Sequence, residues 1–170
     1  MELARSRVRR HWIAPLADGG VLVGTASDGV HRYRLSAGDG LAHAMVAVPT
    51  SHSAAAPSVS AMVVQRDGST WIATSDGALA HAPSPAGPLG LLPADRAPDD
   101  EVTVLSEGPG GTLWAGCNDG SVWRLVRGDV PAFERMPFRL GEFITAILEL
   151  HDGQLWIGSI GDGLLWLADP

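Results

Sequence analysis

Short stretches of apolar residues, separated by glycine-rich polar turns, dominate this chain. The sequence DGQLWIGSIGDGLLWL, residues 152–167, reads as a turn, an apolar strand, a second turn and another strand. Adjacent Asp-Gly pairs favour tight hairpins because glycine readily adopts positive φ. No segment keeps apolar residues at the i, i+3, i+4 and i+7 spacing of an amphipathic helix for long. The pattern therefore predicts an all-β protein.

The same pattern occurs four times along the chain. The copies are 13–35, 62–82, 105–125 and 147–167. A period in the forties with two internal glycine turns is typical of four-stranded propeller blades. The fourth strands are expected at residues 43–48, 90–94 and 132–138. We therefore predict one β-propeller domain, 1–170, of four four-stranded blades, with repeats at approximately 9–50, 58–95, 101–138 and 143–170 plus 2–8.

Closure of this ring depends on the first residues of the chain. The last repeat stops before a fourth strand, and the alignment of Asp18 with Asp152 places residues 2–6 against residues 136–140. We expect the N-terminal strand, residues 2–8, to complete the last blade and remove an open sheet edge. Four blades make a tight ring, however. The alternative is a homodimer in which two chains form one eight-bladed ring with two-fold symmetry.

Composition narrows the classes of partner. The chain has 170 residues, 45% apolar and 18% charged, which fits one ordered globular domain. A net charge of −7 argues against nucleic-acid binding, and no apolar stretch is long enough for membrane insertion. Cys117 is the only cysteine, so no internal disulfide can form. The first ten residues, MELARSRVRR, lack an apolar core, and we expect no secretory signal peptide there.

The sequence ITAILELHDGQLWIGSIGDGLLWL, residues 144–167, closely resembles the repeat of two-component regulator propellers. The copies at 62–82 and 105–125 match this pattern well, whereas the copy at 13–35 has Leu22 in place of tryptophan. The resemblance implies a bacterial propeller sensor module for signal transduction, as in hybrid histidine kinases. It implies a periplasmic location if the chain is a fragment of a sensor. A full-length chain of this kind would instead be cytoplasmic.

Tryptophans mark two further repeat positions with a structural role. Trp71, Trp114 and Trp156 fall at one position on a central strand, where we expect them to pack between blades. Trp123 and Trp166 are assigned to a second shared position with the same role. The aspartates that precede glycines fit tight turns, and they lack the alternating carboxylates of a calcium loop. No metal site is therefore expected at Asp28, Asp76, Asp119 and Asp162.

The innermost strands carry the candidate binding residues. His11, Ser60, Thr103 and Thr145 occupy one repeat position, and the favoured interpretation is that the hydroxyls bond to backbone or to channel water. The sharper hypothesis is a ligand site at the channel mouth, where neighbouring repeats differ most. Asp99, Asp100 and His52 could extend this polar entrance. The candidate ligand-binding set is Arg9, His11, Ser60, Glu101, Thr103, Phe143 and Thr145.

Catalysis and cofactors find little support in the sequence. The six histidines show no H-E-x-x-H spacing, and no G-x-S-x-G sequence is present. We predict a non-catalytic module, without cofactor, that binds a small ligand or a protein partner of unknown identity. One alternative is a scaffold that binds a partner through its rim. The other is an enzyme similar to streptogramin lyases, with His11 or His52 as general base beside Glu101.

Overall fold

The fold was obtained as a computed structural model that describes residues 11–35, 40–50, 57–84, 87–168 and 170, and every regular element within them is a β-strand. Blade 1 consists of β1 (His11–Pro15), β2 (Val21–Thr25), β3 (Val30–Leu35) and β4 (Leu41–Val46). Blade 2 consists of β5 (Val59–Val64), β6 (Thr70–Thr74), β7 (Leu79–Ala82) and β8 (Gly90–Leu91). Blade 3 consists of β9 (Val102–Glu107), β10 (Leu113–Cys117), β11 (Ser121–Val126) and β12 (Ala132–Arg139). Blade 4 consists of β13 (Ile144–Glu149), β14 (Leu155–Ser159) and β15 (Gly163–Leu167).

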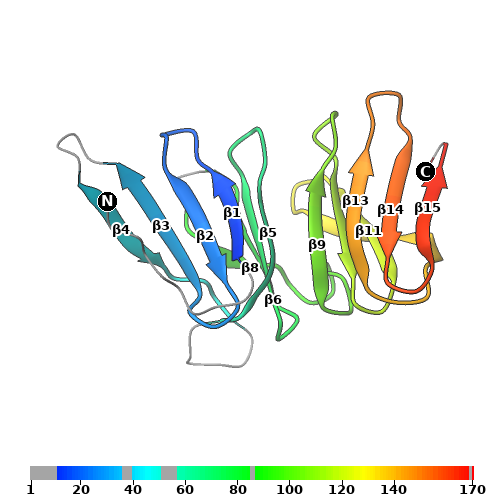
Figure 1. Cartoon of the computed structure of the whole chain (residues 1–170), viewed down its shortest axis with the longest axis horizontal. Helices are drawn as coiled ribbons and strands as arrows, with labels where there is room; N and C mark the ends of the chain where they lie inside the picture. The colour runs from blue at the N-terminus through cyan, green and yellow to red at the C-terminus, as the bar shows by residue number, and fades with distance from the viewer. Residues whose placement is uncertain (1–10, 36–39, 51–56, 85–86, 169) are drawn as a thin grey trace.

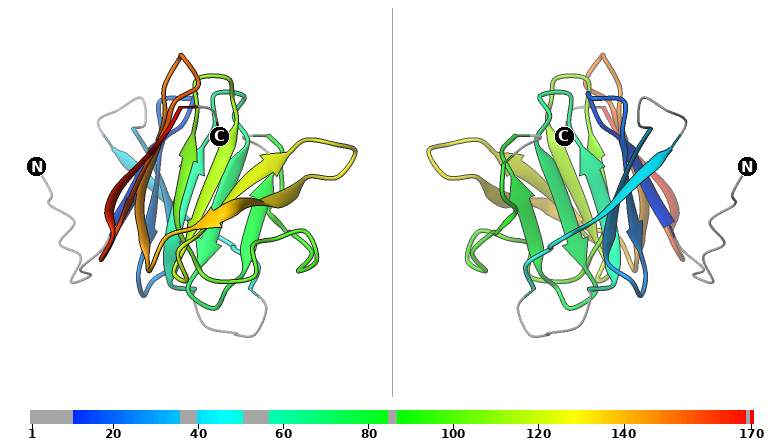
Figure 2. Two further views of the ribbon diagram at one scale, coloured as in Figure 1. Left: turned by 90° about the vertical axis from the view of Figure 1, so that its right-hand side faces the viewer. Right: turned by 90° about the vertical axis from the view of Figure 1, so that its left-hand side faces the viewer.

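The four antiparallel sheets confirm the predicted all-β propeller fold. The first strand of each blade is the innermost, and these strands pack in the order β1, β5, β9 and β13 (Figure 1). The sheets of blades 1 and 4 lie at opposite ends of the molecule in Figure 1. In Figure 2 both sheets lie on the same side of the molecule, and β8 and β12 extend toward the other side. The described blades thus form an open arc. Residues 2–8 lie outside the described residues, so closure by an N-terminal strand stays a prediction.

Aspartate side chains shape the turns. Asp18 Oδ1 accepts a hydrogen bond from Gly20 N at 3.1 Å, and Asp67 Oδ1 accepts one from Ser69 N at 2.9 Å. In each of these turns the glycine after the aspartate has positive φ, 80° at Gly19 and 84° at Gly68, which other residues rarely adopt. The second turns of blades 2 and 3 use the same chemistry, because Asp76 and Asp119 accept from the amides of Ala78 and Ser121. These carboxylates stabilise turns.

Apolar cores lie between consecutive blades. Trp71 of blade 2 packs with Leu113 and Ala115 of blade 3, and Trp114 of blade 3 packs with Ile144 and Leu155 of blade 4. Both tryptophans are fully buried. The tryptophan of a central strand therefore faces the next blade, and the neighbouring strand positions face the preceding one. Leu22 takes this position in blade 1 and packs with Met62 and Ile72 of blade 2.

The strand register corrects the assignment of the other two tryptophans. Trp123 lies opposite Ala115, whereas Trp166 lies opposite Trp156. The two side chains therefore lie on opposite faces of their sheets, and the prediction that they share a repeat position is wrong. The turns that precede them are equally long, but the Asp-Gly pair comes one residue later in blade 4, so an alignment on that pair shifts the register by one.

Hydroxyl groups of the inner strands connect neighbouring blades. Ser60 Oγ donates to the Val102 carbonyl at 2.7 Å, from β5 to β9. Thr103 Oγ1 at the equivalent position donates to the Ile144 carbonyl at 2.6 Å, from β9 to β13, and also lies 3.1 Å from the Gly116 carbonyl. These bonds fix the position of each inner strand along the inner strand of the next blade. They agree with the favoured interpretation that the two hydroxyls bond to the backbone.

The Thr103→Val variant tests this connection. It keeps the shape of the side chain but leaves the Ile144 carbonyl without its donor, so we expect it to lower the free energy of unfolding by about 1–2 kcal/mol. Urea denaturation followed by tryptophan fluorescence measures the change. Thr103→Ser keeps the hydroxyl and should lose less. Equal losses in the two variants would mean that the methyl group, and not the hydrogen bond, stabilises this position.

Candidate functional site

The structure describes only some of the predicted channel residues, and those residues differ in their contacts. Arg9 and His52 lie outside the described residues, and His11 begins β1 without a described side chain. Ser60 and Thr103 direct their hydroxyls to the neighbouring inner strands. Thr145, at the same position in blade 4, is exposed and has no hydrogen-bond partner among the described residues. A ligand contact by any of these residues stays a prediction.

Glu101 and Phe143 lie directly before the inner strands of blades 3 and 4. The Glu101 carbonyl accepts from Asn118 N at 2.9 Å, and the Phe143 carbonyl accepts from Ile160 N at 3.1 Å, so both residues belong to one repeat position. Phe143 has a positive φ of 27°, which is uncommon for a bulky residue. Its amide donates to the Asn118 carbonyl at 2.9 Å, which holds the start of blade 4 against blade 3.

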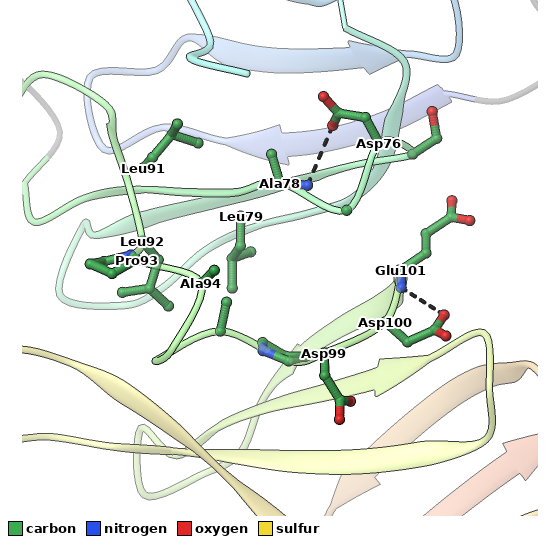
Figure 3. Close-up of a pocket in the computed structure, with 14 residues that line it drawn as sticks. Asp76, Ala78, Leu79, Leu91, Leu92, Pro93, Ala94, Asp99, Asp100 and Glu101 are labelled. Carbon is green, nitrogen blue, oxygen red and sulfur yellow. Dashed lines mark hydrogen bonds between the residues drawn. The ribbon is translucent and has the colours of Figure 1, made fainter. Parts of the chain in front are cut away.

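A hollow of about 850 Å³ opens beside the segment that joins blade 2 to blade 3 (Figure 3). One side is apolar and includes Leu79, Leu91 and Leu92, whereas the other side carries four carboxylates (Figure 3). These carboxylates belong to Asp76, Asp99, Asp100 and Glu101. The sequence analysis predicts Asp99 and Asp100 in a polar entrance and Glu101 in the candidate ligand-binding set, but it misses the apolar side and Asp76.

Backbone hydrogen bonds fix the segment that lines this hollow. Leu92 N donates to the Leu79 carbonyl at 2.8 Å, which holds the start of the segment on β7. Farther along, the Arg96 carbonyl accepts from Phe133 N at 2.8 Å, which attaches the segment to β12. Asp100 Oδ1 accepts from Glu101 N at 2.7 Å. The shape of the hollow is therefore built into the sheets on both sides of it.

The carboxylates create a negative electrostatic field that reaches the core. The pKa of the Cys117 thiol is raised to about 12, mainly by burial and also by the charges of Asp119, Asp100 and Asp99, against an opposing hydrogen bond from Ser121. Cys117 therefore stays protonated at neutral pH and is a packing residue, not a nucleophile. Asp99 is partly compensated by Arg135, whose guanidinium lies 3.7 Å away. A cationic ligand group would be attracted to this hollow.

A smaller hollow of about 190 Å³ lies beside His81 on the rim of blade 2. The His81 ring stacks on the Trp71 indole, with the ring centres 4.0 Å apart. Burial lowers the pKa of His81, the charge of Asp67 opposes this shift, and the charge of Arg127 adds to it. Asp67 and Arg127 form an ion pair at 3.0 Å. Sequence reasoning missed His81, although its repeat position holds Arg32 and Arg124 in other blades.

Blade 1 carries a histidine–carboxylate pair on its outer strands. His31 Nε2 lies 3.2 Å from Asp28 Oδ2, and His31 Nδ1 lies 2.9 Å from His43 Nε2. The Tyr33 ring stacks on His43. These residues belong to β3, β4 and the turn before β3, away from the inner strands, so the pair does not form the channel-mouth site of the lyase alternative. The described residues contain no cluster of three or more His, Cys, Asp or Glu side chains that could hold a metal ion.

The family comparison addresses the predicted resemblance directly. The family model of the two component regulator propeller matches residues 139–161. The match covers the end of β12, the whole of β13 and β14 and the start of the second turn of blade 4. The predicted resemblance is confirmed there, and the search of curated proteins gave no significant match.

Solved structures of other propellers are similar to this chain. Virginiamycin B lyase from Staphylococcus aureus is 17% identical, with a TM-score of 0.64, over 100% of this chain and 59% of the lyase. PorZ, a surface component of the type-IX secretion system of Porphyromonas gingivalis, is 16% identical, with a TM-score of 0.69, over 96% of this chain and 26% of PorZ. The extracellular domain of a protein described as a hybrid two component system, from B. thetaiotaomicron, is 20% identical, with a TM-score of 0.66, over 99% of this chain and 24% of that protein.

At these identities the likeness establishes the fold. The chain is a propeller domain that resembles, in its fold, domains of hybrid two-component systems. It spans less than two thirds of the length of the lyase and about a quarter of the length of the other two proteins. Within the described residues, no helix is long and apolar enough to cross a membrane.

The shifted pKa of His81 gives a pH dependence of stability. Because the folded state lowers this pKa below its ordinary value of 6.5, the unfolded chain binds the proton more tightly, and stability is lost as pH falls below that value. We expect His81→Phe, which keeps a ring on Trp71, to lose less stability than the wild-type chain between pH 7 and pH 5. Urea midpoints measured across this range test the difference. His151→Gln, in an exposed turn, should follow the wild-type curve.

Proposed function

We propose that this chain is a non-catalytic binding module of a propeller sensor, and that the hollow beside residues 92–101 is its contact site. The ligand class that fits is a small molecule or peptide segment with one cationic group and one apolar group. The observation that carries this proposal is the division of the hollow into the leucine side and the carboxylate side (Figure 3). An amine or guanidinium would meet Asp99 and Asp100, while an alkyl group would cover Leu91.

Several physical features support binding at this site. Its lining comes from two blades and from a segment held to β7 and β12, so the site is largely formed before a ligand arrives, which lowers the entropic cost of binding. The hollow lies within the size range of small-ligand sites. The likeness to an extracellular domain of a hybrid two component system supports a sensor role and a place outside the cytoplasm.

The test uses the N-acetylated amide of the dipeptide Arg-Leu (Arg-Leu amide) as probe, with the N-acetylated amide of Glu-Leu (Glu-Leu amide) as the charge-reversed comparison. We expect Arg-Leu amide to shift the backbone amide signals of residues 75–78 and 91–101 in nuclear magnetic resonance titrations, and Glu-Leu amide to leave them unchanged. The Asp99→Asn, Asp100→Asn double variant should weaken binding by about three- to tenfold, the effect of two partly exposed ion pairs. Added salt should weaken it as well.

A matched control keeps this test specific. Asp129→Asn removes one exposed carboxylate from the turn between β11 and β12, and it should leave Arg-Leu binding unchanged. Equal shifts with both dipeptides, or shifts elsewhere on the surface, would refute the proposed site. In that case the alternative of a scaffold that presents its rim to a protein partner would gain support.

A lyase-like enzyme is the second candidate function. The likeness to virginiamycin B lyase over the whole of this chain favours it. The residues that would serve are His11 or His52 as base, beside Glu101. Incubation with quinupristin, followed by mass spectrometry, distinguishes this alternative from binding alone. A product that disappears in the His11→Ala chain or in the His52→Ala chain would replace the non-catalytic proposal, whereas unchanged quinupristin would leave it in place.

A further inference from the structure

The two ends of the arc expose apolar sheet faces. On blade 4, Leu148, Trp156 and Trp166 lie side by side across β13, β14 and β15 on the face that points away from blade 3. Leu148 is 56% exposed and Trp166 is 51% exposed. On blade 1, the row on the face that points away from blade 2 consists of Ile13, Val23, His31 and Met45. Ile13 and Met45 are more than half exposed, whereas His31 is buried. Isolated exposed apolar residues are normal, but rows of this kind mark contact surfaces.

The internal repeats show what covers such faces. Ile13 is 71% exposed, whereas Met62, Leu105 and Ile147 at the same repeat position are at most 9% exposed, because each of them packs on the preceding blade. Trp156 is half-buried, whereas its equivalents are fully buried by the following blade. The residues at both ends therefore match the face of another blade of the same repeat.

Two further residues of blade 4, Gly158 and Thr145, lie at repeat positions that contact the following blade elsewhere in the chain. A side chain at Gly24 or Gly116 would collide with the next inner strand, at Val59 and Ile144 respectively. Gly158 occupies the same position, yet the nearest atom to an added Cβ is Thr145 Oγ1 of its own blade, 3.2 Å away. Thr145 is itself the equivalent of Ser60 and Thr103, whose hydroxyls donate to the next inner strand. Blade 2 has Ala73 at the glycine position, buried in its contact with blade 3, so the position admits at most a small side chain beside a following blade. A small residue at Gly158 and a hydroxyl at Thr145 are what a blade followed by another blade has in this repeat.

The shape of the arc favours a second copy of this chain as that neighbour. The sheets of blades 1 and 4 lie on the same side of the molecule, with blades 2 and 3 behind them (Figures 1 and 2). A copy related by a two-fold axis would therefore present its own blade 1 to blade 4 and its blade 4 to blade 1. Both apolar faces of both copies would be buried at once. Such closed two-fold assemblies are the commonest homo-oligomers.

We propose that two copies of this chain close into one eight-bladed ring, with blade 4 of each copy packed on blade 1 of its partner. Trp156, Trp166 and Leu148 of one copy then cover Ile13 and Met45 of the other. The Thr145 hydroxyl donates to the first inner strand of the partner, and Gly158 allows the close approach. An eight-bladed ring lies within the usual range of propellers.

Light scattering on a sizing column tests the assembly with the 170-residue chain. We expect the mass of two chains, twice 17.8 kDa, over a hundredfold range of concentration. The mass of a single chain throughout this range would overturn the proposal and leave the end faces to a different protein. An open series of larger masses would also overturn it, because head-to-tail contacts would then extend into a filament without closing.

Charged variants identify the faces that meet. Ile13→Lys and Leu148→Glu should each give the mass of one chain, since every interface uses one face of each kind. A mixture of the two variants should regain the mass of two chains, because one interface is then unaltered and the other joins lysine to glutamate. Val130→Glu, in an exposed turn, is the matched control and should stay dimeric. If only one variant dissociates, or the mixture stays monomeric, the proposed pairing of unlike faces is wrong.

Gly158→Ala adds a readout that is independent of surface charge. Within one chain the added methyl lies 3.2 Å from Thr145 Oγ1, an exposed side chain that can shift slightly, so far-ultraviolet circular dichroism should match the wild-type chain. At the proposed interface the methyl faces the inner strand of the partner, and because blade 2 accommodates Ala73 at this position we expect the dissociation constant to rise only about two- to tenfold. An unchanged dissociation constant would overturn the proposed seating of blade 1. Because the hollow lies within one chain, the monomeric variants should still bind Arg-Leu amide, which separates this inference from the proposed function.

Discussion

Packing of one sheet on the next is the interaction on which the whole structure depends. A three- or four-stranded blade has two faces and no core of its own, so each blade is stable only against a neighbour. Trp71 and Trp114 supply the largest buried side chains of these contacts. Truncating a buried tryptophan to alanine typically costs about 3–5 kcal/mol, a large part of the stability of a single domain. Hydrogen bonds such as that from the Thr103 hydroxyl to the Ile144 carbonyl then fix how one inner strand aligns with the next.

This constraint leaves the connections between blades free to carry function. The strands and their turns must satisfy the repeat, whereas the segment from Leu92 to Glu101 only has to bridge two blades. It does so with few regular hydrogen bonds and brings three acidic residues to the edge of an apolar surface. Burial is the main reason why the thiol of Cys117 stays neutral in the core, and the charges of Asp100 and Asp99 add to this effect. A rigid array thus holds a variable binding surface in a fixed position.

Repeat spacing and turn chemistry made the blades, their order and most of their register predictable from the sequence. The positions of Ser60 and Thr103 followed from the same alignment, because both precede the same apolar residue of an inner strand. The alignment failed at Trp166, where one shifted Asp-Gly pair moves a side chain to the opposite face of the sheet. The hollow could not be foreseen, since Asp76 and Leu91 approach Asp99 only through the bend of the connecting segment. The stack of His81 on Trp71 likewise depends on the pairing of two strands.

The outer faces of blades 1 and 4 indicate how the two ends of this repeat array associate. Repeat arrays that stay single have polar outer faces on their terminal units, because an uncovered apolar face invites association. Here the outer face of blade 4 carries Leu148 and Trp166, and that of blade 1 carries Ile13 and Met45. The outer face of blade 1 also carries His31, Tyr33 and His43, so it is mixed, whereas the row of Leu148, Trp156 and Trp166 on blade 4 is apolar. Gly158 matches Gly24 and Gly116, where an added side chain would collide with the following blade. The same physics that holds blade 2 to blade 3 therefore calls for a further blade at each end of the arc.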